Sequence, residues 1–133
     1  MSLRLDRLVW LGLLSLSIGS AGALAEPYPW DMLKDGDFKQ AYRAMLGTKA
    51  KLRWLAKLDG PANPVERIEV GEDRESFILI KACKPHDCTS HNIVVLYSPN
   101  QKVTYAKLVE SPGSVLLGRP PASLVAILEE QSK

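Results

Sequence analysis

The chain has 133 residues and a formal net charge of +2, with 17 basic and 15 acidic side chains. This length fits one domain with one modest core, and it leaves no room for a deep internal active site. No run of lysine or arginine interleaved with aromatic residues is present in the sequence. We therefore expect no nucleic-acid partner.

The first 25 residues have the pattern of a cleaved secretory leader. Arg4 and Arg7 precede an apolar run that begins at Leu8, and the segment ends with an A-x-A cleavage pattern at 23–25. The apolar run is shorter than the roughly 20 residues that a bilayer span requires. We predict a signal peptide over residues 1–25 and a single mature domain over 26–133, with no membrane segment after cleavage.

The first part of the mature chain is predicted to be helical, after an extended lead-in over 26–30 and a short turn over 31–33. Apolar residues recur at the spacing of one helix face from Phe38 onward, with Asp37 as the expected N-cap and Gly47 as the C-terminal stop. A second helix is expected over 48–58. It carries four basic residues, Lys49, Lys51, Arg53 and Lys57. We interpret these as a solvated helix face rather than as a surface for an anionic partner.

The rest of the chain predicts about five sequential strands and a short C-terminal helix. The strands are expected at 65–70, 77–82, 93–97, 103–109 and 115–117, and the helix at 123–131. Short turns between strands favour an antiparallel meander, in which alternate connections lie at the same end of the sheet. We therefore expect the 83–91 loop beside Asn63 and Glu110, with the acidic 71–75 turn at the opposite end.

The only two cysteines lie between the second and third predicted strands. They bracket four residues in the segment Cys83-Lys84-Pro85-His86-Asp87-Cys88. Export would place both thiols in an oxidising compartment, so we predict a disulfide. So short a ring adds only about 2 kcal/mol by loop closure. Together with the fixed φ of Pro85, it stiffens the tip of the loop instead, which lowers the cost of binding. We interpret the segment as a rigid loop that presents His86.

Other interpretations of this loop are an enzyme site, a metal site, and a turn stapled only for stability. The chain shows no nucleophile-elbow motif and no sign of a carboxylate pair in a cleft, so we expect no enzyme. Two sulfurs and two imidazoles could bind zinc, from Cys83, His86, Cys88 and His91. However, the Cys-x4-Cys spacing is unlike tight zinc motifs and unlike the Cys-x-x-Cys of thiol oxidoreductases, and oxidation removes both thiolates. We expect no metal and no cofactor. The purely structural staple stays open.

The hexapeptide resembles the signature loop of the Ivy family, which comprises periplasmic inhibitors of vertebrate (C-type) lysozyme from Gram-negative bacteria. The leader, the helical segment and the meander also resemble that family, so the resemblance covers most of the mature chain. It implies an α+β fold, with a five-stranded antiparallel meander between helices on both faces in α/β/α layers. It also implies a periplasmic location.

By the same resemblance, the loop would enter the lysozyme cleft, where His86 would meet the two catalytic carboxylates. An imidazole can donate to carboxylates from either nitrogen, and from both when it is protonated. Asp87 is expected to accept backbone N–H groups and shape the turn, while Lys84 either contacts cleft carbonyls or points to water. The alternative partner is an endogenous lytic transglycosylase, whose site also centres on a carboxylic acid. The sequence leaves a homodimer open.

Overall fold

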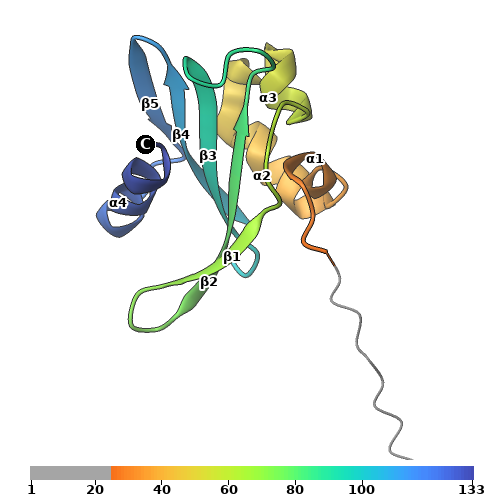
Figure 1. Cartoon of the computed structure of the whole chain (residues 1–133). Helices are drawn as coiled ribbons and strands as arrows, with labels where there is room; N and C mark the ends of the chain where they lie inside the picture. The colour runs from red at the N-terminus through yellow and green to blue at the C-terminus, as the bar shows by residue number, and fades with distance from the viewer. Residues whose placement is uncertain (1–24) are drawn as a thin grey trace, which may run out of the picture.

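The computed structural model describes residues 25–133. All of the predicted leader except Ala25 lies outside these described residues. Within residues 25–133, no helix is long and apolar enough to cross a bilayer. The described chain forms one five-stranded antiparallel sheet with helices on both faces (Figure 1).

The sheet is a simple meander. Its strands are β1 (Glu66–Val70), β2 (Glu75–Cys83), β3 (His91–Ser98), β4 (Val103–Glu110) and β5 (Gly113–Leu117). Each strand pairs antiparallel with the next one in the chain, in the order β1-β2-β3-β4-β5. The predicted strand positions and the predicted topology are both confirmed, with boundaries within two residues. Runs of β-branched and aromatic residues bounded by turn residues were a sufficient signal here.

One face of the sheet is covered by the N-terminal helices. These are α1 (Pro29–Met32), α2 (Gly36–Leu46) and α3 (Arg53–Lys57), with the 3-10 helix η1 (Gly47–Lys51) between the last two. The larger core lies between them and the sheet. Its fully buried side chains include Phe38, Tyr42, Leu55, Ile80, Val95, Ala106 and Leu108.

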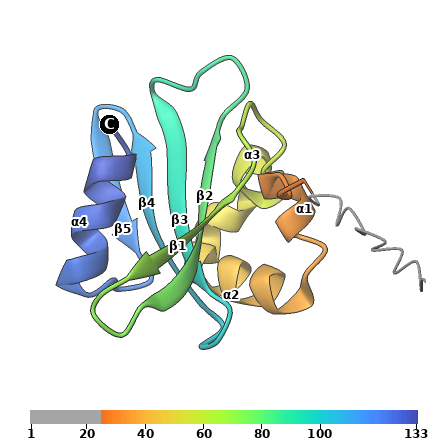
Figure 2. The ribbon, with the colours of Figure 1, turned by 60° about the horizontal axis from the view of Figure 1, so that its bottom comes forward.

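The C-terminal helix α4 (Ala122–Gln131) covers the other face, as Figure 2 shows. Leu124 and Leu128 pack there against strand residues in a second, smaller core. The strand side of this core comprises Phe77, Leu79, Val94 and Leu96. An ion pair between Lys107 and Glu129 also ties α4 to β4. The expected α/β/α layers are therefore confirmed.

The helix boundaries differ from the prediction in three places. Asp35, not Asp37, caps α2, because its carboxylate accepts the backbone N–H groups of Asp37 at 2.9 Å and Phe38 at 3.2 Å. Where an extended lead-in over 26–30 and a short turn over 31–33 were expected, the chain forms α1, a single helical turn in which Asp31 accepts the Tyr28 backbone N–H at 3.0 Å. One helical turn is too short to show a periodic pattern in the sequence.

The expected helix over 48–58 is wrong. The chain forms η1, opens into an extended conformation at Leu52, and re-enters a helix only at α3. Trp54 and Leu55 are buried on α3, whereas the preceding segment has no apolar stripe and Leu52 is exposed. Because packing of an apolar face supplies most helical stability, the segment before α3 has little to hold it in a continuous helix.

The two ends of the sheet carry the connections that the meander predicts. At one end, His91 pairs with Glu110, and the Ser111 N–H donates to the Ser90 carbonyl at 2.8 Å. At the opposite end, the Gln101 side chain donates to Glu75 at 2.6 Å. The cysteine loop and the 71–75 turn are therefore separated by the length of the sheet.

Candidate functional site

The loop between β2 and β3 is closed by a disulfide between Cys83 and Cys88, as predicted. The two Cα atoms lie 4.8 Å apart. Cys83 is the last residue of β2 and is buried, whereas Cys88 is exposed. The ring is thus anchored in the sheet at one side, and its tip projects beyond the sheet.

The tip is a four-residue turn over 84–87. The Asp87 N–H donates to the Lys84 carbonyl at 3.0 Å, and the Lys84 N–H donates to the His91 carbonyl at 3.0 Å. Pro85 occupies the second position, and His86 occupies the third with φ +65°. Proline followed by a residue with positive φ is the arrangement of a type II turn, whose third position normally favours glycine or asparagine.

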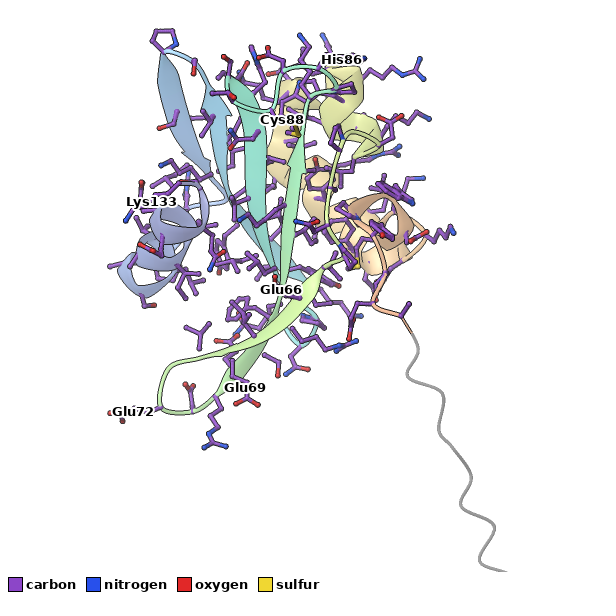
Figure 3. The ribbon with its side chains drawn as sticks, viewed as in Figure 1. Glu66, Glu69, Glu72, His86, Cys88 and Lys133 are labelled. Carbon is purple, nitrogen blue, oxygen red and sulfur yellow. A yellow bond between two sulfur atoms is a disulfide. The ribbon has the colours of Figure 1, made fainter. Side chains whose placement is uncertain are left out.

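The His86 side chain is exposed at the outermost point of this turn (Figure 3). Within residues 25–133, its ring takes part in none of the side-chain hydrogen bonds or ion pairs. Figure 3 also shows that His86 and Glu72 lie at opposite ends of the molecule. The structure therefore offers an imidazole with both ring nitrogens available to a partner.

A second histidine holds the base of the turn. His91 Nδ1 lies 2.7 Å from Asp87 Oδ2, and the His91 N–H donates to the Asp87 carbonyl at 3.0 Å. Asn92 adds a bond from its side-chain amide to the Cys88 carbonyl at 3.0 Å. Asp87 does shape the turn, but the expected backbone acceptor role is wrong, because its carboxylate contacts the His91 ring instead.

The link between α3 and β1 lies directly against the loop. A Cβ atom on Gly60 would sit 1.9 Å from the Cys83 carbonyl oxygen and 3.3 Å from Pro85 Cδ. Only glycine allows this approach, because real Cβ contacts do not fall below about 3 Å. The Pro61 carbonyl oxygen lies 3.3 Å from Cys83 Sγ. The first half of the loop therefore has a backbone support underneath.

Lys49 and Glu110 form an ion pair across the other side of the base. Glu110 is the β4 residue that pairs with His91, and the sequence placed it beside the loop. The contribution of Lys49 and the close approach of Gly60 were missed, as was the contact between His91 and Asp87. The four-residue spacing of Asp87 and His91 was the only local signal for the last of these.

The four residues considered for zinc are neighbours in the sequence, but their side chains do not converge on a common point where a metal ion could bind. Both sulfurs are in the disulfide, the His86 ring is at the tip, and the His91 ring faces Asp87. Among residues 25–133, no group of three histidine, cysteine, aspartate or glutamate side chains is placed to hold a metal ion.

The fold and the loop together define a small α+β domain with a disulfide-closed hairpin tip that carries an exposed histidine. The chain belongs to the Ivy family: the sequence model described as "Inhibitor of vertebrate lysozyme (Ivy)" matches residues 37–132. The chain is similar to the inhibitor of vertebrate lysozyme of Pseudomonas aeruginosa PAO1, with 26% identity over 110 residues, covering 80% of this chain and 71% of that protein.

The protein of the same name in Escherichia coli K12 is 33% identical over 60 residues. That match covers 45% of this chain and 36% of the relative. The counterpart in E. coli O157:H7 matches with the same identity over the same length. The predicted family is thus confirmed, and the matching sequence model covers most of the described chain.

Proposed function

We propose that this protein inhibits C-type lysozyme by inserting the tip of the Cys83–Cys88 loop into the muramidase cleft. The observation that carries the proposal is the exposed His86 ring, which has no hydrogen-bond or ion-pair partner among residues 25–133 and stands on a turn closed by a disulfide. Membership of the family supports the same target class. The protein would act without catalysis of its own and without a cofactor.

The chemistry of the target explains why an imidazole fits. Muramidase catalysis requires one protonated and one ionised carboxyl group on either side of the scissile bond. An imidazole between them can bond to one carboxyl group from each nitrogen. Such bonds are among the stronger polar contacts when they are charge-assisted and shielded from water. Occupation of this position removes both carboxyl groups from catalysis.

The structure of the loop reduces the entropy cost of this insertion. The disulfide, the proline and the bond between Asp87 and His91 hold the turn in one conformation before binding. A preorganised tip loses less conformational freedom on binding than a flexible loop of equal length. For the encounter to occur, the protein would be exported to the periplasm by the leader over 1–25.

The test is a titration of C-type lysozyme activity with the purified mature protein. His86→Ala should raise the inhibition constant about 30- to 5000-fold, since truncating one partner of a buried charge-assisted pair costs about 2–5 kcal/mol. Glu72→Ala, at the opposite end of the sheet, is the matched control and should inhibit like the wild type. Full lysozyme activity at micromolar wild-type protein would contradict the proposal.

The same tip would fit a lytic transglycosylase, whose site also depends on a carboxylic acid. A parallel titration against such an enzyme decides between the two targets. Inhibition of the transglycosylase alone, lost in His86→Ala, would move the target to the endogenous enzyme while leaving the role of the loop unchanged.

A further inference from the structure

A groove of about 550 Å³ runs beside the loop. One wall is formed by Lys84 and Pro85, in the first half of the loop. The other wall is formed by residues 52–54, where η1 ends and α3 begins. Leu52 is among the few large apolar side chains that remain exposed among the described residues. The groove therefore has an apolar lip next to the tip that carries His86.

The charged groups of this groove are predominantly basic once internal pairs are set aside. Glu110, which lines it, is paired with Lys49, and His91 is engaged by Asp87. Arg53 and Lys84 also line it. Neither belongs to any ion pair within 4.0 Å that residues 25–133 form.

Two further charges complete the balance. Asp59, an exposed residue, is the acidic group of the lining that has no such pair. Lys51, the last residue of η1, is exposed directly before Leu52. The unpaired charged side chains that line the groove are thus two cations, Arg53 and Lys84, and one anion, Asp59. A carboxylate entering the groove would meet a favourable local field.

The break at Leu52 changes where the basic side chains of this segment lie. In one continuous helix, Lys49, Lys51, Arg53 and Lys57 would have been a solvated face. In the structure, Lys49 turns to Glu110, Arg53 lines the groove, and Lys57 lies at a separate depression beside Trp30. The chain has therefore placed one of these cations, Arg53, opposite Lys84 across the groove.

Binding through His86 would bring a partner into contact with this groove. Pro85 lines the groove and is covalently adjacent to His86, so the two sites are one residue apart, about 4 Å between Cα atoms. A cleft that encloses His86 would therefore bring its surface close to the groove.

We propose that this groove is a second contact surface, which receives an acidic segment on the rim of the muramidase cleft. Arg53 and Lys84 bind its carboxylates, and Leu52 with Pro85 provides the apolar contact. This inference rests on the proposed function, and it adds a preference among target enzymes. Among muramidases that admit His86, the protein binds faster to those with an acidic rim than to those with a basic rim.

The experiment measures association rates by biolayer interferometry on two forms of one target. The target is C-type lysozyme, either unmodified or succinylated so that lysine ammonium groups become carboxylates. The wild-type protein should associate about 10-fold faster with the succinylated form at low salt, and the difference should shrink as salt is raised. Arg53→Glu and Lys84→Glu should each reverse this preference.

The matched control is Arg67→Glu, which makes the same change in net charge. Arg67 pairs with Ile78 of β2. The six positions from Ile78 to Lys84 place it about 20 Å away along the strand, beyond the Debye length. It should keep the wild-type preference. Lys84→Arg retains the cation and should also behave like the wild type, which separates loss of charge from damage to the loop.

The outcomes separate this inference from the proposed function. Equal association rates for Arg53→Glu, Lys84→Glu and wild type, with inhibition still lost in His86→Ala, would overturn the inference and leave the proposed function standing. If the wild-type protein neither inhibits nor binds either form of lysozyme, the inference and the proposed function are both overturned. Binding of chitotriose to the free protein, abolished by Arg53→Glu, would also overturn the inference, because the groove would then be a glycan site.

Discussion

His86 stands in a backbone conformation that few residues other than glycine adopt. Its φ of +65° costs about 1–2 kcal/mol for an ordinary L-residue. The surrounding contacts hold this conformation, because the disulfide, the two backbone bonds of the turn and the contact between Asp87 and His91 all act within nine residues. The result is that the exposed imidazole stands on a turn that is already ordered before any partner arrives.

The hexapeptide could be recognised from the sequence because its constraints are local. A ring between two cysteines and a proline within it are visible without knowledge of the fold. Gly60 could not be recognised in the same way, because it reads as an ordinary helix terminator in Asp59-Gly60-Pro61. Its role comes from contact with Cys83, a residue 23 positions later, and only the tertiary structure supplies that contact.

Gly60→Ala should therefore displace the support of the loop. The added Cβ would overlap the Cys83 carbonyl oxygen, and both are backbone-fixed atoms that cannot rotate away. We expect a loss of about 1–3 kcal/mol in the free energy of unfolding, measured by urea denaturation, together with weaker inhibition of lysozyme. Gly36→Ala is the matched control, since no atom lies within 4 Å of its added Cβ. A Gly60→Ala protein with wild-type stability and inhibition would contradict this prediction, because the segment between α3 and β1 could then move without cost.

At the scale of elements, strands were more predictable than helices. The strand signal survives in a short window, either as a continuous buried run, as in β3, or as alternation, as in β4, where Thr104, Ala106 and Leu108 are buried in turn. The helices on the larger core are short, and their boundaries depend on tertiary contacts. The start of α3 is an example, because the chain is extended at Leu52 and no glycine or proline marks that break in the sequence.

One buried hydrogen bond joins α2 to α3 across this less predictable region. The Tyr42 hydroxyl, fully buried, donates to the Leu55 carbonyl at 2.7 Å. Tyr42→Phe should lower the free energy of unfolding by about 1–2 kcal/mol at neutral pH, because a buried carbonyl loses its donor. Urea denaturation of the two proteins at pH 7 measures this difference.

The same pair of proteins should converge at high pH. Burial raises the pKa of Tyr42 above its ordinary value of 10.0, so the folded state keeps the phenol proton while the unfolded state releases it. The tyrosine contribution is complete below about pH 10 and falls as pH rises beyond it, by up to about 1.4 kcal/mol per pH unit. Tyr28→Phe, an exposed position, should follow the wild type throughout. A gap between Tyr42→Phe and wild type that stays constant to pH 11.5 would contradict this account.

At the scale of the whole molecule, the meander brings three separate connections to one end of the sheet. The 83–91 loop, the 58–65 link and the turn after β4 meet there, while the acidic turn after β1 lies at the other end. This arrangement followed from strand order alone, which is why Asn63 and Glu110 could be placed beside the loop in advance. The groove could not, because it depends on the break at Leu52.

The loop and the two cores should respond differently to loss of the disulfide. A ring of six residues restrains little of the unfolded chain, so the double variant Cys83→Ser, Cys88→Ser should lose only about 2 kcal/mol in the free energy of unfolding. The tip, however, would have to become ordered on binding. Ordering only two of its residues costs about 2–4 kcal/mol, which corresponds to about 30- to 1000-fold in the inhibition constant.

Urea denaturation and lysozyme titration on the same preparation measure both effects, and wild-type protein treated with a phosphine reductant should reproduce the double variant. The comparison also decides whether the disulfide is only a structural staple. If the variant loses stability but inhibits as well as the wild type, the ring serves the fold alone. If inhibition falls much further than stability, the ring serves to hold His86 ready for the cleft, because the body of the domain is stable without it.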